Sequence, residues 1–98
     1  MKAPHECSSL GEVRTEIDRI DQQIITALGE RFAYVKAAAA FKATTADVAA
    51  PDRVTAMIEQ RRAWASEQGL SPDVIDHIYR ELVTYFTSEE ARHWHGPN

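Results

Sequence analysis

Two cationic residues share one face of a predicted helix with apolar side chains. Arg31 and Lys42 are spaced for the same face, and Val35 and Ala38 lie between them. A buried cation is costly unless a negative group meets it, so this pair could bind an anionic ligand. The alternative stays equally open, because long side chains often reach water or pair with nearby acids, here Glu30 and Asp47.

Arg14 flanks the same apolar stripe near the start of the helix. It could pair with Asp18 one turn later, in a surface contact that contributes ~0.3 kcal/mol. Arg14 and Arg31 are seventeen positions apart, which is roughly 25 Å along one helix and too far for a small ligand to span. If both serve one site, Arg14 must come from a second subunit, and antiparallel pairing of two such helices would make two equivalent sites.

Two further charged residues occupy positions where a ligand contact is possible. Arg53 follows Pro51 at the start of a second predicted helix, where the helix N-terminus already favours anions. Glu90 shares a helical face with Tyr79 and Phe86, and a carboxylate on an apolar face is unusual. The alternative for Arg53 is a solvated residue in the first turn of the helix. The alternative for Glu90 is a side chain at the edge of this apolar face that reaches solvent.

The first helix must position most of these groups. Ser9 and Glu12 form a capping-box pattern, which predicts a helix from Leu10 to about Lys42. Such a helix is roughly 50 Å long, whereas a compact monomer of this size is about 33 Å across. Either the helix breaks near Gly29 or a second chain covers its apolar stripe, and we favour the homodimer. The stripe comprises Leu10, Val13, Ile17, Ile20, Ile24, Leu28, Val35 and Ala38.

Two more helices complete an all-α chain without strands or repeats. Residues 44–50 are predicted to form a loop, and Pro51 opens a second helix that stops at Gly69. Ser71 and Pro72 open a third helix, which is expected to end before Gly96. We therefore expect a single domain over residues 1–98 with three helices, the first of them long.

Composition narrows the classes of function. The formal net charge of −4 argues against nucleic acid as a partner, and no apolar run is long enough for a membrane span. The single Cys7 fits a reducing, cytoplasmic compartment. Two neighbouring histidines, His93 and His95, lie on different sides of the chain, so no metal site is expected.

The sequence resembles the all-helical chorismate mutase family over nearly its whole length. Within that family it is most similar to the branch whose members cleave isochorismate to salicylate and pyruvate. The residues that carry the resemblance are Arg14, Ile17-Asp18-Arg19-Ile20-Asp21, Ala27-Leu28, Arg31, Tyr34-Val35-Lys36-Ala37-Ala38, Phe41-Lys42, Ala50-Pro51-Asp52-Arg53-Val54 and Met57, together with the spacing to Trp64 and Trp94.

The resemblance implies two interlocked chains, two active sites and a pericyclic reaction without a cofactor or metal. It implies that Arg14 reaches across from the partner, that Arg31 binds a substrate carboxylate, and that Lys42 lies beside the breaking ether bond. A further anion contact would be Arg53, and residues 44–50 would close as a lid. The apolar walls implied are Val35, Ala38, Met57 and Phe86.

Three positions bear on which reaction is expected. Mutases of the family usually carry acidic residues in and after the loop, where this chain has Ala50 and Val54, which favours isochorismate as substrate. The lyases carry glutamine where this chain has Glu90, and a glutamate must be protonated before it can donate a hydrogen bond. The alternatives are a chorismate mutase that forms prephenate, and a non-catalytic helical dimerisation module.

Overall fold

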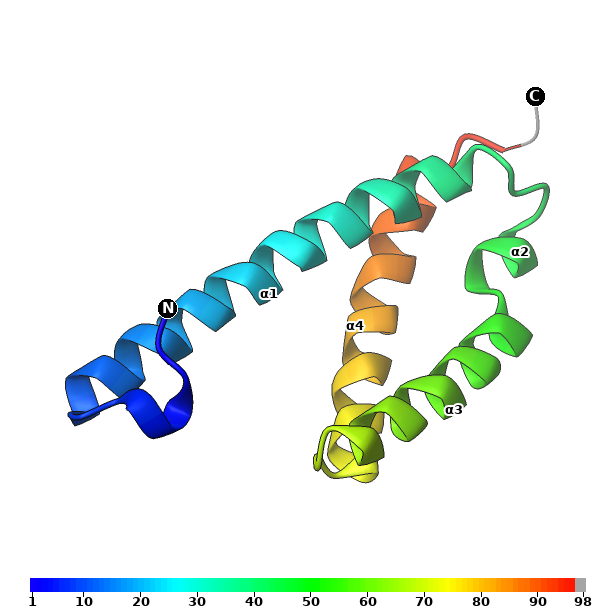
Figure 1. Cartoon of the computed structure of the whole chain (residues 1–98). Coiled ribbons are helices and arrows are strands. Elements are labelled where there is room, and N and C mark those ends of the chain that lie inside the picture. Colours follow the sequence, from blue (N-terminus) through cyan, green and yellow to red (C-terminus); the bar gives the residue numbers. More distant parts are fainter. Residues whose placement is uncertain (97–98) are drawn as a thin grey trace. The chain divides into compact units, whose positions relative to one another are not determined.

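The computed structural model describes residues 1–96, and its regular elements there are all helical (Figure 1). The predicted all-α class with three helices, the first of them long, is therefore confirmed, and two short helical elements are added to it. The chain divides into two compact units, residues 1–33 and the part that begins at Tyr34. The elements are η1 (Pro4–Glu6), α1 (Leu10–Ala39), α2 (Thr45–Ala49), α3 (Pro51–Glu67) and α4 (Pro72–His93).

Helix α1 begins where the sequence predicts. The Ser9 hydroxyl accepts a hydrogen bond from the Glu12 N–H at 3.1 Å, as an N-cap should. The Glu12 carboxylate reaches back to the N–H of Ser8 at 2.8 Å rather than to that of Ser9. The helix continues through Gly29 without interruption and ends at Ala39, three residues before the predicted Lys42. It ends early because the N–H groups of residues 40–42 bond to carbonyls three residues back.

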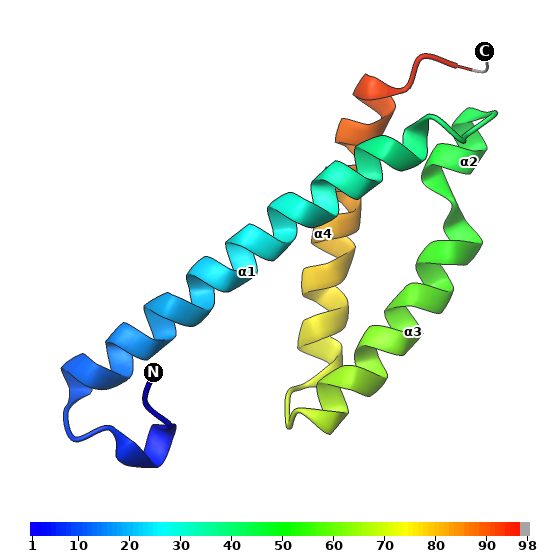
Figure 2. The same ribbon diagram turned by 45° about the horizontal axis from the view of Figure 1, so that its top comes forward.

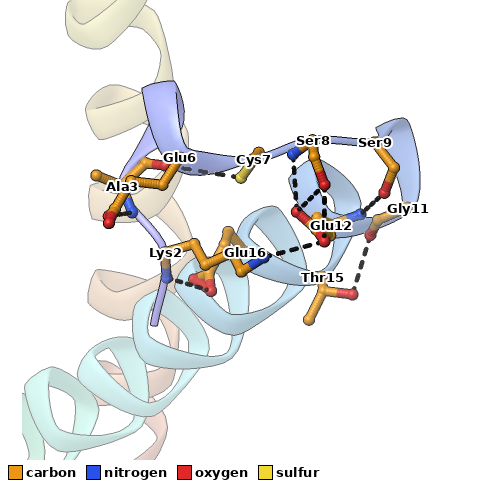
Figure 3. Close-up of polar contacts among 10 residues, drawn as sticks. All are labelled: Lys2, Ala3, Glu6, Cys7, Ser8, Ser9, Gly11, Glu12, Thr15 and Glu16. Carbon is orange, nitrogen blue, oxygen red and sulfur yellow. Dashed lines mark hydrogen bonds and ion pairs between the residues drawn. The ribbon is translucent and has the colours of Figure 1, made fainter.

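The N-terminal segment folds onto the first turns of α1 (Figure 3). The Lys2 N–H donates to Glu16 at 3.0 Å, and the Lys2 ammonium lies 3.0 Å from Glu12. The N–H of Ser8, with Lys2, holds the pKa of Glu12 below its ordinary value. Arg19, with the Lys2 N–H, lowers the pKa of Glu16.

Helices α3 and α4 form an antiparallel hairpin and lie side by side in both ribbon views (Figures 1 and 2). Gly69, at φ 73°, ends α3: its N–H bonds to the Ser66 carbonyl, and the Leu70 N–H bonds to the Ala65 carbonyl at 2.8 Å. This is the Schellman arrangement, in which the left-handed residue is most easily a glycine. The Ser71 hydroxyl then caps α4 by accepting from the Val74 N–H.

Charged and aromatic side chains join the two helices of the hairpin. Arg62 of α3 contacts Asp73 at 2.8 Å and Asp76 at 2.9 Å, both on α4. The Arg61 guanidinium stacks 4.8 Å from the ring centre of Trp64 and 5.6 Å from that of Tyr79. The buried apolar residues of this unit are Ala39, Val48, Met57, Ile58, Ala65 and Phe86.

The prediction of a plain loop over residues 44–50 is wrong, because a short helix, α2, forms there. Thr44 and Asp47 make a complete capping box: the Thr44 hydroxyl accepts from the Asp47 N–H, and the Asp47 carboxylate accepts from the Thr44 N–H, each at 3.1 Å. Val48 is buried, and α2 contacts α4. Ala50 separates α2 from α3 in a left-handed conformation, with φ 43°.

Candidate active site

Lys42 is the centre of the candidate site. It follows the end of α1, and its ammonium nitrogen donates to the Asp47 carbonyl at 2.9 Å. The same nitrogen lies 3.1 Å from Oε2 of Glu90 on α4. Only 23% of the Lys42 side chain is exposed. An ammonium has three N–H donors, so these two contacts leave capacity for a ligand anion.

Glu90 is a buried carboxylate, with 5% of the residue exposed. The alternative that it reaches solvent at the edge of its stripe is therefore wrong. Its Oε2 has no aligned hydrogen-bond donor among residues 1–96, so the charge of Lys42 is what compensates its burial. This oxygen also keeps an unused capacity to accept a hydrogen bond from a ligand.

The turn after Lys42 is held by its own polar groups. The Asp47 carboxylate accepts the N–H groups of Ala43 and Thr44, each at 3.1 Å. This cross-bonding fixes the backbone of Asp47, whose carbonyl accepts from Lys42. The contribution of Asp47 could have been found in the sequence, because Thr44 and Asp47 have the spacing of a capping box.

An open hollow of about 750 Å³ lies at this end of the second unit. Its lining holds two cations, Lys42 and Arg53, and two carboxylates, Asp47 and Asp52. The Asp47 carboxylate already accepts two main-chain N–H groups, so Lys42 and Arg53 are the groups of the lining that could bind an anion. Arg53 lies in the first turn of α3, as predicted, and its side chain is exposed. The rest of the lining is Ala38, Phe41, Ala46, Asp47, Ala50, Pro51 and Asp52.

The predicted apolar walls divide into two groups. Ala38 is half-buried and lines the hollow. Met57 and Phe86 are buried, each with 4% exposed, and neither belongs to the lining. Val35 is half-buried on α1 and also lies outside the lining. In this structure Met57 and Phe86 therefore contribute to the core beneath the site.

The two remaining predicted arginines lie on α1 within the first compact unit. Arg14 is exposed, and among residues 1–96 its alternative ion pair with Asp18 is not formed. Arg31 is half-buried. The two residues occupy one continuous helix, so the spacing of roughly 25 Å along its axis applies.

Trp94 makes a contact with Lys42 that the sequence does not predict. Its indole N–H donates to the main-chain carbonyl of Lys42 at 3.0 Å. Trp94 directly follows α4 and is half-buried. The two residues are 52 positions apart, and no local pattern marks a pairing at that distance.

His5, His77, His93 and His95 are all exposed. Over the part of the chain that the structure describes, no three histidine, cysteine or acidic side chains gather as metal ligands do. Within the same residues, no helix has both the length and the apolar content needed to cross a bilayer.

Comparisons with known proteins identify the family of this chain. The family model of chorismate mutase type II matches residues 13–91. The chain is 42% identical over 94 residues to the isochorismate pyruvate lyase of Pseudomonas aeruginosa, covering 96% of this chain and 93% of that protein. It is 30% identical over 76 residues to the T-protein of Haemophilus influenzae, covering 76% of this chain and 20% of that longer protein. The chain belongs to the chorismate mutase type II family.

Proposed function

We propose that this chain is an isochorismate-pyruvate lyase, an enzyme that converts isochorismate to salicylate and pyruvate. The observation that carries the proposal is the 42% identity to a protein of that name over almost the full length of both chains. The ammonium of Lys42, held beside a hollow that Arg53 also lines, supplies the positive charge that such a dicarboxylate needs.

The reaction requires positioning rather than covalent chemistry. A hydrogen moves within isochorismate as the ether C–O bond breaks, the ring becomes aromatic, and the side chain leaves as pyruvate. No nucleophile or general base takes part. The protein contributes by holding the side chain over the ring and by stabilising negative charge that develops on the ether oxygen.

Lys42 is the residue that we assign to the ether oxygen. A hydrogen bond to the Asp47 carbonyl and the charge of Glu90 hold its ammonium, and the N–H groups that Asp47 does not accept are available to the substrate. Fixing a donor before the substrate arrives reduces the reorganisation needed in the transition state. The family resemblance assigns the carboxylate contacts to Arg31 and to Arg14 of a second copy of the chain.

Glu90 is the counter-ion of Lys42 in the protein without substrate. A substrate carboxylate that approaches Lys42 must compete with it, because the ion pair is 3.1 Å long and the Glu90 side chain is only 7% exposed. In its ionised form Glu90 accepts hydrogen bonds and cannot donate one to the substrate. We therefore propose that Glu90 lowers the rate relative to a glutamine at this position.

The homodimer forms part of this proposal. Apolar residues of α1 remain about half exposed, including Ile17 at 51%, Ile20 at 45% and Ile24 at 50%. A row of such side chains along one helix is costly in water and is typical of a surface that pairs with another chain. We propose antiparallel pairing of two α1 helices in a cytoplasmic enzyme.

Chorismate mutase activity is the second candidate, and the match of the chorismate mutase type II model over residues 13–91 favours it. The same cations would hold chorismate, whose rearrangement to prephenate is also pericyclic. Ala50 and Val54 provide no acceptor for a ring hydroxyl, so we expect this activity to be the weaker one.

The test is the fluorescence of salicylate when the purified chain meets isochorismate, with prephenate formation from chorismate measured alongside. Salicylate formation above the uncatalysed rate is the expected result. Prephenate without salicylate would replace the lyase by the mutase. If neither product forms and salicylate does not raise the melting temperature, the chain is a non-catalytic dimerisation module.

A further inference from the structure

The main-chain carbonyl of Lys42 lies in the turn that follows α1, three residues after the helix ends at Ala39. A main-chain carbonyl outside a helix has no donor within the helix and needs another partner. The Lys42 N–H still bonds back to the Ala39 carbonyl at 3.2 Å, but its own carbonyl lies beyond the helix. The indole N–H of Trp94 satisfies it at 3.0 Å.

Trp94 and Glu90 hold Lys42 at its two ends. Trp94 bonds to the backbone of Lys42, whereas Glu90 pairs with the ammonium at the tip of the side chain. Both come from the C-terminal end of α4, where Trp94 is the capping residue. The main-chain N–H of Trp94 bonds to the Ala91 carbonyl at 3.4 Å, so the backbone that carries the indole is tied to the helix end.

We propose that Trp94 is a positioning residue for the reaction, because it fixes the backbone from which the Lys42 ammonium extends. The inference rests on the proposed function and adds a residue that does not touch the hollow itself, since Trp94 is absent from its lining. A lysine side chain has four rotatable methylene bonds, so fixing only its tip leaves its base free to move. The Trp94 contact removes that freedom by anchoring the main chain.

The variant Trp94→Phe tests this, because it keeps an aromatic ring, although a smaller one, and removes the N–H donor. We expect kcat to fall about fivefold, as for one lost hydrogen bond that positions a reacting group. The matched control is Trp64→Phe, because Trp64 is 46% exposed and its indole has no acceptor within residues 1–96. It should keep the wild-type kcat.

A readout that depends on Lys42 separates positioning from a merely structural effect. Salicylate is the probe, and its dissociation constant is measured for wild type, Trp94→Phe, Lys42→Ala and the double variant. We expect Trp94→Phe to weaken binding about fivefold in the wild-type background and to have no further effect once Lys42 is alanine. An equal loss in both backgrounds means that Trp94 acts only on the fold, and the inference is then wrong.

The two proposals fail in different ways. A wild-type chain that neither forms nor binds salicylate overturns the lyase assignment and the role of Trp94 with it. An active wild type whose Trp94→Phe variant matches Trp64→Phe in kcat and salicylate affinity overturns the role of Trp94 alone.

Discussion

At the scale of single residues, the site depends on the mutual neutralisation of Lys42 and Glu90. A carboxylate that is 5% exposed is stable there because an ammonium lies 3.1 Å away. Removing the cation therefore has two consequences. It takes away the charge proposed for catalysis, and it leaves a buried carboxylate without compensation.

The variant Lys42→Ala should lose about a hundredfold or more in kcat, which corresponds to about 3 kcal/mol of lost transition-state stabilisation. Its free energy of unfolding should fall by about 2 kcal/mol, because Glu90 is left buried and unpaired. Steady-state assays and urea unfolding at fixed protein concentration measure the two effects.

Adding Glu90→Gln to Lys42→Ala separates these two effects. The neutral amide needs no counter-ion, so we expect stability to return close to that of wild type while activity stays lost. Recovery of activity together with stability would show that Lys42 acts through the fold alone.

By itself, Glu90→Gln should raise kcat/KM for isochorismate about tenfold. The amide no longer neutralises the Lys42 ammonium, and its NH₂ group can donate a hydrogen bond to the substrate. The matched control is Glu89→Gln, which alters a neighbouring acid paired with Arg92 at 3.0 Å. A rate equal to that of wild type in both variants would remove Glu90 from the site.

At the scale of elements, the short segment between α1 and α3 carries the local strain of the fold. Ala50 adopts φ 43° and ψ 58°, a left-handed conformation that costs an L-residue about 1–2 kcal/mol. Pro51 follows directly and restricts the backbone of Ala50 further. The hydrogen bond from the Ala50 N–H to the Ala46 carbonyl, at 2.8 Å, closes α2 and helps to hold this conformation.

Ala50→Gly should therefore stabilise the protein by up to about 1 kcal/mol, since glycine enters this region without the steric cost but loses more chain entropy on folding. The control Ala49→Gly lies in the last turn of α2 and should destabilise by about 0.5–1 kcal/mol. Urea unfolding of both variants measures the difference. Destabilisation by Ala50→Gly would contradict this account of the turn.

The α3–α4 hairpin should be sensitive to acid through Asp76. Arg80, and then Arg62, hold the pKa of Asp76 below its ordinary value of 3.8. A lowered pKa in the folded state means that this contribution to stability is present above the ordinary value and is lost as the pH falls through the folded value.

The free energy of unfolding of wild type should therefore decline from about pH 4 downward more steeply than that of Asp76→Asn. Asp73→Asn is the control, because Asp73 contacts Arg62 but its side chain is 87% exposed. Equal slopes for wild type and Asp76→Asn would show that the pair of arginines does not stabilise the hairpin.

How far the sequence predicts this molecule depends on the range of each interaction. The residues that begin and end a helix act through contacts with their neighbours in sequence. The positions of Ser9, Gly69 and Ser71 therefore predict the helix bounds to within a few residues. The helix α2 is predictable in principle, because its capping box is also local, although the loop predicted over residues 44–50 overlooks that box.

The site itself was predicted only in part. Glu90 stood out as a charge on an apolar stripe, yet its pairing with Lys42 joins residues 48 positions apart and is set by packing. The contact between Trp94 and Lys42 joins residues 52 positions apart. It uses the main-chain carbonyl of Lys42, and a pattern of side chains cannot indicate such a bond.

At the scale of the whole molecule, the decisive question is whether one site uses residues of two chains. Arg14 and Arg31 lie seventeen residues apart on one continuous helix, so a small ligand cannot contact both within a single chain. In the proposed dimer, each site takes Lys42 from one chain and Arg14 from the other. Arg14→Ala and Lys42→Ala should each be nearly inactive alone, because every site then lacks one cation.

Mixing these two variants tests the arrangement directly. After unfolding and refolding together in equal amounts, half of the dimers are mixed, and each mixed dimer has one site with both cations intact. Activity should therefore return to about a quarter of the wild-type value per chain. Two copies of one variant refolded alone provide the control. If Arg14 and Lys42 served a site within the same chain, every site would remain defective and mixing would restore nothing.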